Sequence, residues 1–229
     1  MGWTVAVSKK KALEKNTPEA DGALLRGTVE EIAEMASGSE ETLLLVVGSL
    51  SCDRRTQRTL AARVVRLLTE SRPDLLRGYG PELADALLRP EAQTRWEILA
   101  ALEKMVAQDA RVADRAIGAT VTSLHDAESG ITRLAAFQLL CSYGATTAHR
   151  SEKVWPFIDE AVRVYHGDPE FPSMLLGVYR LVTGAASDEV KLAAAKRMEF
   201  DAETAKGIVG HRARMIVGCA PTKKKKLKR

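Results

Sequence analysis

The stretch Glu91–Val106, EAQTRWEILAALEKMV, is followed along the chain by a similar stretch, ESGITRLAAFQLLC, at Glu128–Cys141. In both, an acidic residue comes first and an arginine follows (Arg95 and Arg133). Apolar residues then recur at the three- and four-residue spacing of an amphipathic helix. Two such copies on one chain predict an architecture of repeated helical units.

The remainder of the chain carries further helical patterns, and no run alternates as a surface strand does. Apolar spacing and the positions of Gly and Pro predict eleven helices, at about 21–36, 40–50, 54–71, 73–88, 90–106, 110–124, 128–141, 151–165, 172–183, 187–200 and 201–218. Gly78 and Gly80-Pro81 are points at which the fourth helix can break. We expect Ser51 or Asp53 to cap the third helix and Ser151 to cap the eighth. The sequence therefore predicts an all-α protein.

The helix-start arginines set the period of the repeat. Arg58, Arg95 and Arg133 follow one another at intervals of 37 and 38 residues. Helix pairs of this length cannot bury their apolar faces alone, so they stack on one another. We expect an α-solenoid of about five antiparallel helix pairs plus a capping helix, with the odd-numbered helices from the third onward forming a concave face. The expected domains are a loosely ordered segment 1–20, a repeat domain 21–218 and a basic tail 219–229.

These repeats resemble a known motif. Arg95–Leu102 (RWEILAAL) and Arg133–Leu140 (RLAAFQLL) are similar to the second helix of a HEAT repeat, and Arg58–Val65 (RTLAARVV) is so more weakly. The helix at 172–183 departs from the pattern, because Phe171-Pro172 stands where the acid–base pair should be. The resemblance implies a HEAT-like helical solenoid and does not identify a partner.

Composition excludes several classes of protein. Hydrophobic residues make up 45% and charged residues 28%, as in soluble globular proteins. No apolar run is long enough to cross a membrane, and the N-terminus lacks the order of a signal peptide. We expect a soluble protein in the cytoplasm, with the nucleus as an open alternative. The three cysteines and four histidines are scattered, so we expect no disulfide, no metal and no cofactor.

The positive charge is concentrated at the C-terminus. The chain carries a net charge of +4, and the tail alone supplies more than this, so the body is net acidic. The tail residues are Lys223, Lys224, Lys225, Lys226, Lys228 and Arg229. We expect them to bind polyanions, including nucleic acid, or else to serve as a solubilising end. The run also resembles a nuclear-localisation cluster.

Within the body, the densest basic cluster is the best candidate for contact with phosphate or an acidic peptide. Its members are Arg54, Arg55, Arg58, Arg63 and Arg66. Arg95 and Arg133 either belong to a concave surface that binds an anionic ligand or form a structural ladder with acids such as Glu91 and Glu128. We favour the ladder, because basic residues on helices are usually solvated or locally paired.

Two tryptophans leave an enzymatic alternative open. Some HEAT-like proteins of this length resemble the alkylpurine DNA glycosylase class, which places aromatic residues and an acid in a concave cleft. Trp96, Trp155, Asp159 and Arg133 are the residues that such a site would use here, although the tryptophan and aspartate pattern of that class is not reproduced. The preferred prediction is a non-enzymatic scaffold that binds a protein or peptide on its concave face, with Trp96 and Trp155 among the contact residues.

Overall fold

The computed structural model describes residues 24–221, so the expected segment 1–20 and the basic residues of the tail lie outside the described part. The described residues fall into two compact units, which divide between Leu139 and Leu140. The helices are α2 (Val29–Gly38), α3 (Glu40–Ser49), α4 (Arg55–Ser71), α5 (Pro73–Leu76), α6 (Gly80–Ala86), α7 (Ala92–Val106), the 3-10 helix η1 (Ala110–Ala113), α8 (Ile117–Leu124), α9 (Gly130–Gly144), α10 (Ala148–Val164), α11 (Phe171–Thr183), α12 (Asp188–Thr204) and α13 (Gly207–Gly218). Since residues 24–221 contain no strand, the all-α prediction is confirmed.

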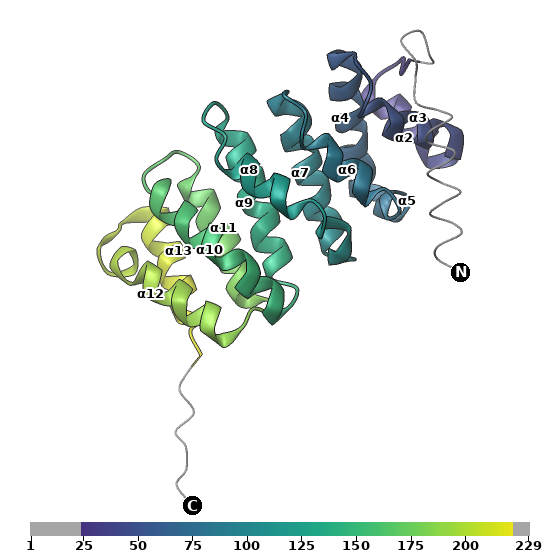
Figure 1. Cartoon of the computed structure of the whole chain (residues 1–229). Coiled ribbons are helices and arrows are strands. Elements are labelled where there is room, and N and C mark those ends of the chain that lie inside the picture. The colour runs from purple at the N-terminus through teal and green to yellow at the C-terminus, as the bar shows by residue number, and fades with distance from the viewer. Residues whose placement is uncertain (1–23, 222–229) are drawn as a thin grey trace, which may run out of the picture. The chain divides into compact units, whose positions relative to one another are not determined.

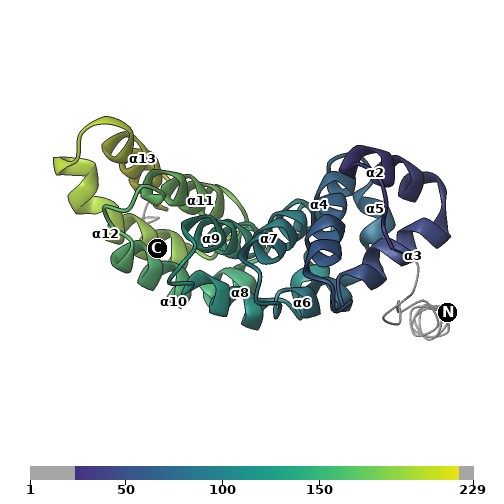
Figure 2. The same cartoon turned by 90° about the horizontal axis from the view of Figure 1, so that it is seen from above.

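Each unit has two layers of helices. In the first unit, α4 and α7 pack side by side, and α6 and α8 lie in the layer beneath them (Figure 1, Figure 2). In the second unit, α11 contacts α13 in one layer and α10 contacts α12 in the other. None of the described helices combines the length and the apolar character that a bilayer crossing requires.

The predicted apolar stripes form the core. Ile98, Leu99 and Leu102 of α7 are fully buried, as are Phe137 and Leu140 of α9. Burial of large aliphatic and aromatic side chains contributes roughly 1.5–3 kcal/mol each. The helical periodicity of the sequence therefore identified the faces that pack against neighbouring helices.

The first helix begins later than predicted. Thr28 is its N-cap, and the side chains of Thr28 and Glu31 form a reciprocal capping box with each other's backbone N–H groups, at 3.2 and 2.8 Å. Gly27 precedes it with φ of 117°, a conformation that suits glycine and stops a helix from continuing. The prediction of a start at residue 21 is wrong, because the sequence signal Thr-x-x-Glu was overlooked.

Two predicted helices are divided. The helix expected at 73–88 forms α5 and α6, as Gly78 and Gly80 indicated. Gly80 packs closely against the 3-10 helix η1, because a Cβ at this position would lie 2.9 Å from the carbonyl oxygen of Val112. The helix expected at 110–124 is also divided, into η1 and α8, and that break was not predicted.

The expected N-caps are wrong at two helices. Arg54 is the N-cap of α4 and makes no side-chain capping bond, whereas Ser51 and Asp53 lie before it. Thr147 caps α10 by accepting from the N–H of Arg150 at 3.2 Å.

Ser151 is buried inside α10 instead of capping it. Its hydroxyl accepts the backbone N–H of Ser187 at 3.0 Å, which ties the start of α12 to α10. The last helix boundary also differs from the prediction, because α12 continues to Thr204 and places Asp201 inside the helix. Helix α13 begins at Gly207, whose φ is 63°.

Candidate functional site: an arginine ladder and an exposed basic face

Arg58, at the start of α4, is held by the loop before it and by the next repeat. One terminal nitrogen donates to the carbonyl oxygens of Cys52 and Asp53, each at 2.8 Å. The guanidinium also makes a two-bond pair with the Glu91 carboxylate, one bond being Nε to Oε2 at 3.2 Å. The side chains of Arg58 and Glu91 are only 10% and 5% exposed. This arginine is therefore committed to the packing of α4 against α7.

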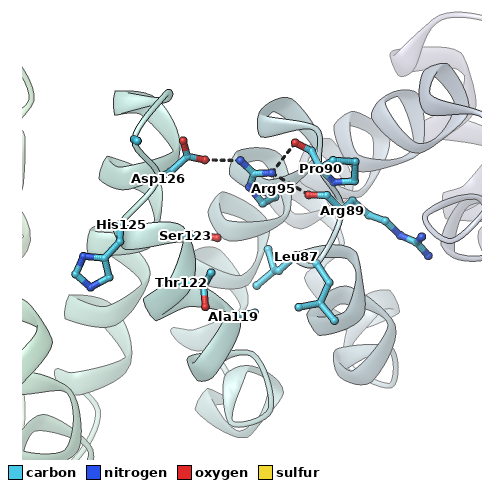
Figure 3. A pocket seen from close by; sticks show the side chains of 11 residues that line it. Leu87, Arg89, Pro90, Arg95, Ala119, Thr122, Ser123, His125 and Asp126 are labelled. Carbon is cyan, nitrogen blue, oxygen red and sulfur yellow. Dashed lines mark hydrogen bonds and ion pairs between the residues drawn. The ribbon is translucent and has the colours of Figure 1, made fainter.

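Arg95 repeats the arrangement one helical repeat later, in the same compact unit (Figure 3). Its Nη1 donates to the carbonyl oxygens of Arg89 and Pro90, at 2.9 and 2.7 Å. Its Nη2 pairs with the carboxylate of Asp126. The same constellation thus recurs at the interval that the sequence predicted.

Asp126 is the centre of the next turn. Its Oδ1 accepts the backbone N–H groups of Glu128 and Ser129, at 2.9 and 3.0 Å, and its carbonyl oxygen accepts from Arg133 at 2.9 Å. The partner of Arg95 is thus Asp126, which was not among the acids named as examples for the ladder, Glu91 and Glu128. A short carboxylate that also closes the turn before α9 suits this position better than an exposed glutamate.

The ladder shifts the pKa values of its acids. The hydrogen bonds from Arg58 hold the pKa of Glu91 below its ordinary range, against the opposing effect of burial, and the pKa of Arg58 is raised in turn. Burial alone would raise the pKa of Asp126, but the bonds from Arg95 and from two backbone N–H groups outweigh it and lower that pKa. Both carboxylates are therefore held in the charged form.

A cavity of about 450 Å³ lies beside this second rung, in the first unit (Figure 3). Leu87, Leu88, Pro90 and Ala119 give it an apolar wall, and the remaining lining residues are Arg89, Arg95, Thr122, Ser123, His125, Asp126 and Ala127. Of the charged groups at its edge, Arg95 and Asp126 pair with each other, and Arg89 donates to the carbonyl oxygen of Ser51 at 3.3 Å. We therefore assign this cavity no chemical role.

The exposed face of α4 and α7 differs from the ladder. The guanidinium of Arg66 lies 5.9 Å from the ring centroid of Trp96 and also pairs with Glu97 of α7 and, at 3.2 Å, with Glu70. The Arg66 side chain remains 38% exposed, whereas Glu97 is buried. Arg63, one turn before Arg66, is exposed. An aromatic ring and two arginines thus meet on one surface.

Glu97 fixes this arrangement. Burial raises the pKa of Glu97, and the hydrogen bond from Arg66, together with the charges of Arg66 and Arg63, partly offsets that effect. Sequence reasoning missed Glu97, although a carboxylate within the apolar stripe of α7 is a signal that a buried partner is needed.

The predicted residues are thus divided among different surroundings. Arg58 and Arg95 belong to the ladder, whereas Arg54, Arg55 and Arg63 are exposed on α4 or at its start. Arg133 bonds the turn before its own helix.

The residues of the enzymatic alternative are divided between the units. Trp96 and Arg133 lie in the first unit, and Trp155 and Asp159 in the second. The Asp159 carboxylate accepts two hydrogen bonds from Arg197, at 2.6 and 3.0 Å. Both tryptophans are partly buried.

Among residues 24–221, no group of three or more His, Cys, Asp or Glu side chains is placed to hold a metal ion. Cys52, Cys141 and Cys219 form no disulfide with one another, and Cys141 is buried in the core. His166 lies with Nε2 2.9 Å from Asp201 Oδ1 and with its ring 4.6 Å from that of Phe171. This contact joins the α10–α11 corner to α12.

The chain has the fold of known helical repeat proteins. It is similar to a designed armadillo repeat protein solved with the peptide (KR)4, with a TM-score of 0.68, 13% identity and coverage of 84% of this chain and 91% of that one. A computationally designed armadillo repeat protein for modular peptide recognition gives a TM-score of 0.64 at 15% identity, covering 84% and 92%. An engineered protein gives 0.66 at 10% identity, covering 84% and 88%.

This likeness confirms the helical solenoid class and does not separate HEAT from armadillo units. No family model matches the chain, and no curated protein matches it.

Proposed function

We propose that the protein is a non-enzymatic scaffold that holds an acidic, extended protein segment on the exposed face of α4 and α7. The observation that carries this proposal is the Arg66–Trp96 pair with Arg63 beside it. Arginine binds carboxylates with two parallel hydrogen bonds, and a tryptophan offers a large surface that loses little entropy on binding. Arg66 already pairs with Glu97 and Glu70 and holds its guanidinium near the Trp96 ring, so in this proposal Arg63 binds the acidic side chains of the segment and Trp96 its apolar ones.

The neighbouring helices extend the same chemistry. Arg55 is exposed at the start of α4, and α9 contains no acidic residue. Ile131, near the start of α9, is 52% exposed. These residues add positive charge and apolar area, both of which suit a segment that is acidic and partly apolar.

The structural neighbours support peptide binding on a helical array of this kind. One is described in complex with (KR)4 and another as designed for modular peptide recognition. The (KR)4 peptide is basic, and the α4–α7 face of this chain is basic as well, so the two would repel each other. We therefore expect this chain to prefer the opposite charge.

In this proposal, the basic tail provides a second site of contact with anionic partners. It carries six basic residues in seven positions and suits polyanions without sequence preference. A DNA-binding repair protein resembling the alkylpurine DNA glycosylase class is the alternative, and it needs the body itself to bind DNA.

The test separates the face from the tail. A fluorescent octaglutamate peptide is titrated with the full chain in which the six basic tail residues are serine, and anisotropy is recorded at low salt. We expect saturable binding that Arg63→Glu weakens on the order of tenfold, because it replaces an attraction with a repulsion. Arg77→Glu is the matched control. Arg77 is exposed at the end of α5, and its substitution changes the net charge by the same amount.

Three results would contradict the proposal: no binding of the acidic peptide, equal weakening by both variants, or tighter binding of an octalysine peptide. Binding of a DNA duplex by the tail-substituted chain, with no binding of the peptide, would instead favour the repair protein.

A further inference from the structure

Two exposed arginines of α4 carry charges that the fold does not use. Among residues 24–221, no side chain or carbonyl oxygen forms an ion pair or a hydrogen bond with the guanidinium of Arg55 or Arg63. Their charges act on the carboxylates of Glu91 and Glu97, respectively, but each of these carboxylates already pairs with another arginine of α4. Arg55 and Arg63 therefore leave two positive charges available on the α4–α7 face.

The acidic residues that border these two arginines have basic neighbours of their own. Glu70 is the one acidic residue of α4, and it pairs with Arg66 at 3.2 Å. The other two acids that border the face are each followed in the sequence by a basic residue, in Asp53-Arg54 and Glu103-Lys104. The face therefore keeps its basic character around Arg55 and Arg63.

The two arginines flank a single residue. Arg55, Thr59 and Arg63 follow one another at intervals of four residues, which places them on one ridge of α4. Successive members are separated by about 6 Å along the helix axis. An arginine carries its guanidinium on a long, flexible stem, so both guanidiniums can reach a group that lies over Thr59.

Thr59 supplies a hydroxyl at the midpoint of this ridge. The residue is half-buried beside α7, and its Oγ1 lies 3.5 Å from Oγ1 of Thr94. Well-formed bonds between hydroxyl oxygens measure about 2.5–3.0 Å, so this contact engages the Thr59 hydroxyl only weakly. The hydroxyl is therefore available as a third donor between the two guanidiniums.

We propose that the segment held by the α4–α7 face carries a phosphorylated serine or threonine, whose phosphoryl group is bound over Thr59 by Arg55 and Arg63. A phosphoryl group carries a charge of about −1.5 to −2 at neutral pH and three acceptor oxygens, which match two guanidiniums and one hydroxyl. A carboxylate brings one charge and two oxygens and would leave part of this set unused. The inference rests on the proposed function and names the anionic group that the same face binds.

The first experiment compares three forms of one peptide, which consists of glycine, serine and a single leucine and carries phosphoserine, glutamate or serine at one position. Fluorescence anisotropy measures their affinities for the full chain with the serine-substituted tail. We expect the phosphoserine form to bind on the order of tenfold more tightly than the glutamate form, because phosphate accepts more charge-assisted hydrogen bonds.

The pH dependence identifies the dianion. Binding of the phosphoserine form should weaken between about pH 7.5 and pH 5.5, because the second pKa of a phosphoryl group is about 6 and arginine stays charged. Octaglutamate remains ionised over this range, so its affinity should stay the same and serves as the control for changes in the protein. Equal pH dependence of the two ligands would contradict the inference.

Variants of the ridge locate the phosphoryl group. Arg55→Gln and Arg63→Gln should each weaken the phosphoserine form on the order of tenfold, whereas Arg77→Gln, at the end of α5, should not. Because both arginines hold one group, the double variant should lose less than the product of the two single losses. Thr59→Val keeps the shape of the side chain without the hydroxyl and should weaken binding a few-fold. Circular dichroism verifies that the variants are folded.

The outcomes separate this inference from the proposed function. If the phosphoserine form binds no better than the glutamate form, or if the Arg55 and Arg63 variants act no more strongly than Arg77→Gln, the inference fails, and binding of octaglutamate leaves the proposed function standing. If neither the phosphoserine peptide nor octaglutamate binds, both fail. Tighter binding of a single-stranded DNA oligomer than of the phosphoserine peptide would assign the two arginines to a nucleic-acid backbone and overturn the inference.

Discussion

Removing Glu91 tests the ladder most sharply. The Glu91→Ala substitution leaves the guanidinium of Arg58, whose side chain is 10% exposed, without its carboxylate partner. Breaking a buried pair by removing one partner costs about 3–5 kcal/mol of unfolding free energy. Arg58 keeps its two hydrogen bonds to the carbonyl oxygens of Cys52 and Asp53, so we expect a loss near the lower end of that range.

The double variant Arg58→Met/Glu91→Leu should be less destabilised than Glu91→Ala alone. An apolar pair of similar volume leaves no buried charge behind, and such replacements are often neutral or stabilising. The two lost bonds to carbonyl oxygens each cost about 0.5–1.5 kcal/mol, so the double variant should lose about 1–3 kcal/mol.

Urea unfolding at pH 7, followed by circular dichroism, measures these differences. Asp85→Ala is the control, because the Asp85–Arg115 pair is more than half exposed and its removal should cost at most about 1 kcal/mol. A cost for Glu91→Ala that is no larger than that of the control would refute the reasoning, as would a double variant that loses more than the single one.

Three further predictions concern the core, the pH dependence and the tail. Leu99→Ala and Leu140→Ala should each lower the unfolding free energy by about 2–5 kcal/mol, since both side chains are fully buried, and a loss under about 1 kcal/mol at both would contradict the packing. The pKa of Glu91 is lower in the folded chain, so its contribution is present at neutral pH and lost as the pH falls through the folded pKa. The difference in unfolding free energy between the wild type and Glu91→Gln should therefore decrease as the pH is lowered, which urea unfolding at a series of acidic pH values measures. Ending the chain at Pro221 should abolish salt-sensitive binding to a DNA duplex, and unchanged affinity in a filter-binding assay would mean that the body holds the site.

The sequence predicted the helical class because apolar periodicity and burial have a common cause, as the buried stripe of α7 shows. It also predicted the repeat, because Arg58 and Arg95 occupy equivalent rungs. Helix ends were less predictable, since they depend on single capping bonds such as that of Thr28. The periodicity of apolar residues does not decide which Ser, Thr or Asp near the start of a helix is its N-cap.

Site residues were the least predictable feature. The arginine cluster of α4 reads as one group in the sequence, yet Arg58 is buried in the ladder while Arg63 is exposed. The difference follows from the position of each residue around the helix and from carboxylates on α7, which are distant in sequence. Glu97 and Asp126 therefore escaped notice, because their importance depends on those contacts.

The indole N–H resonances offer the most direct test of the proposed binding face. The chain has three tryptophans, Trp3, Trp96 and Trp155, so three indole signals are expected in a proton–nitrogen spectrum, and single Trp→Phe variants assign them. Adding an acidic peptide to the chain with a serine-substituted tail should shift the Trp96 signal in proportion to saturation and leave that of Trp155 in place. If Trp96 stays unmoved while the peptide binds, the α4–α7 face is not where the acidic segment sits.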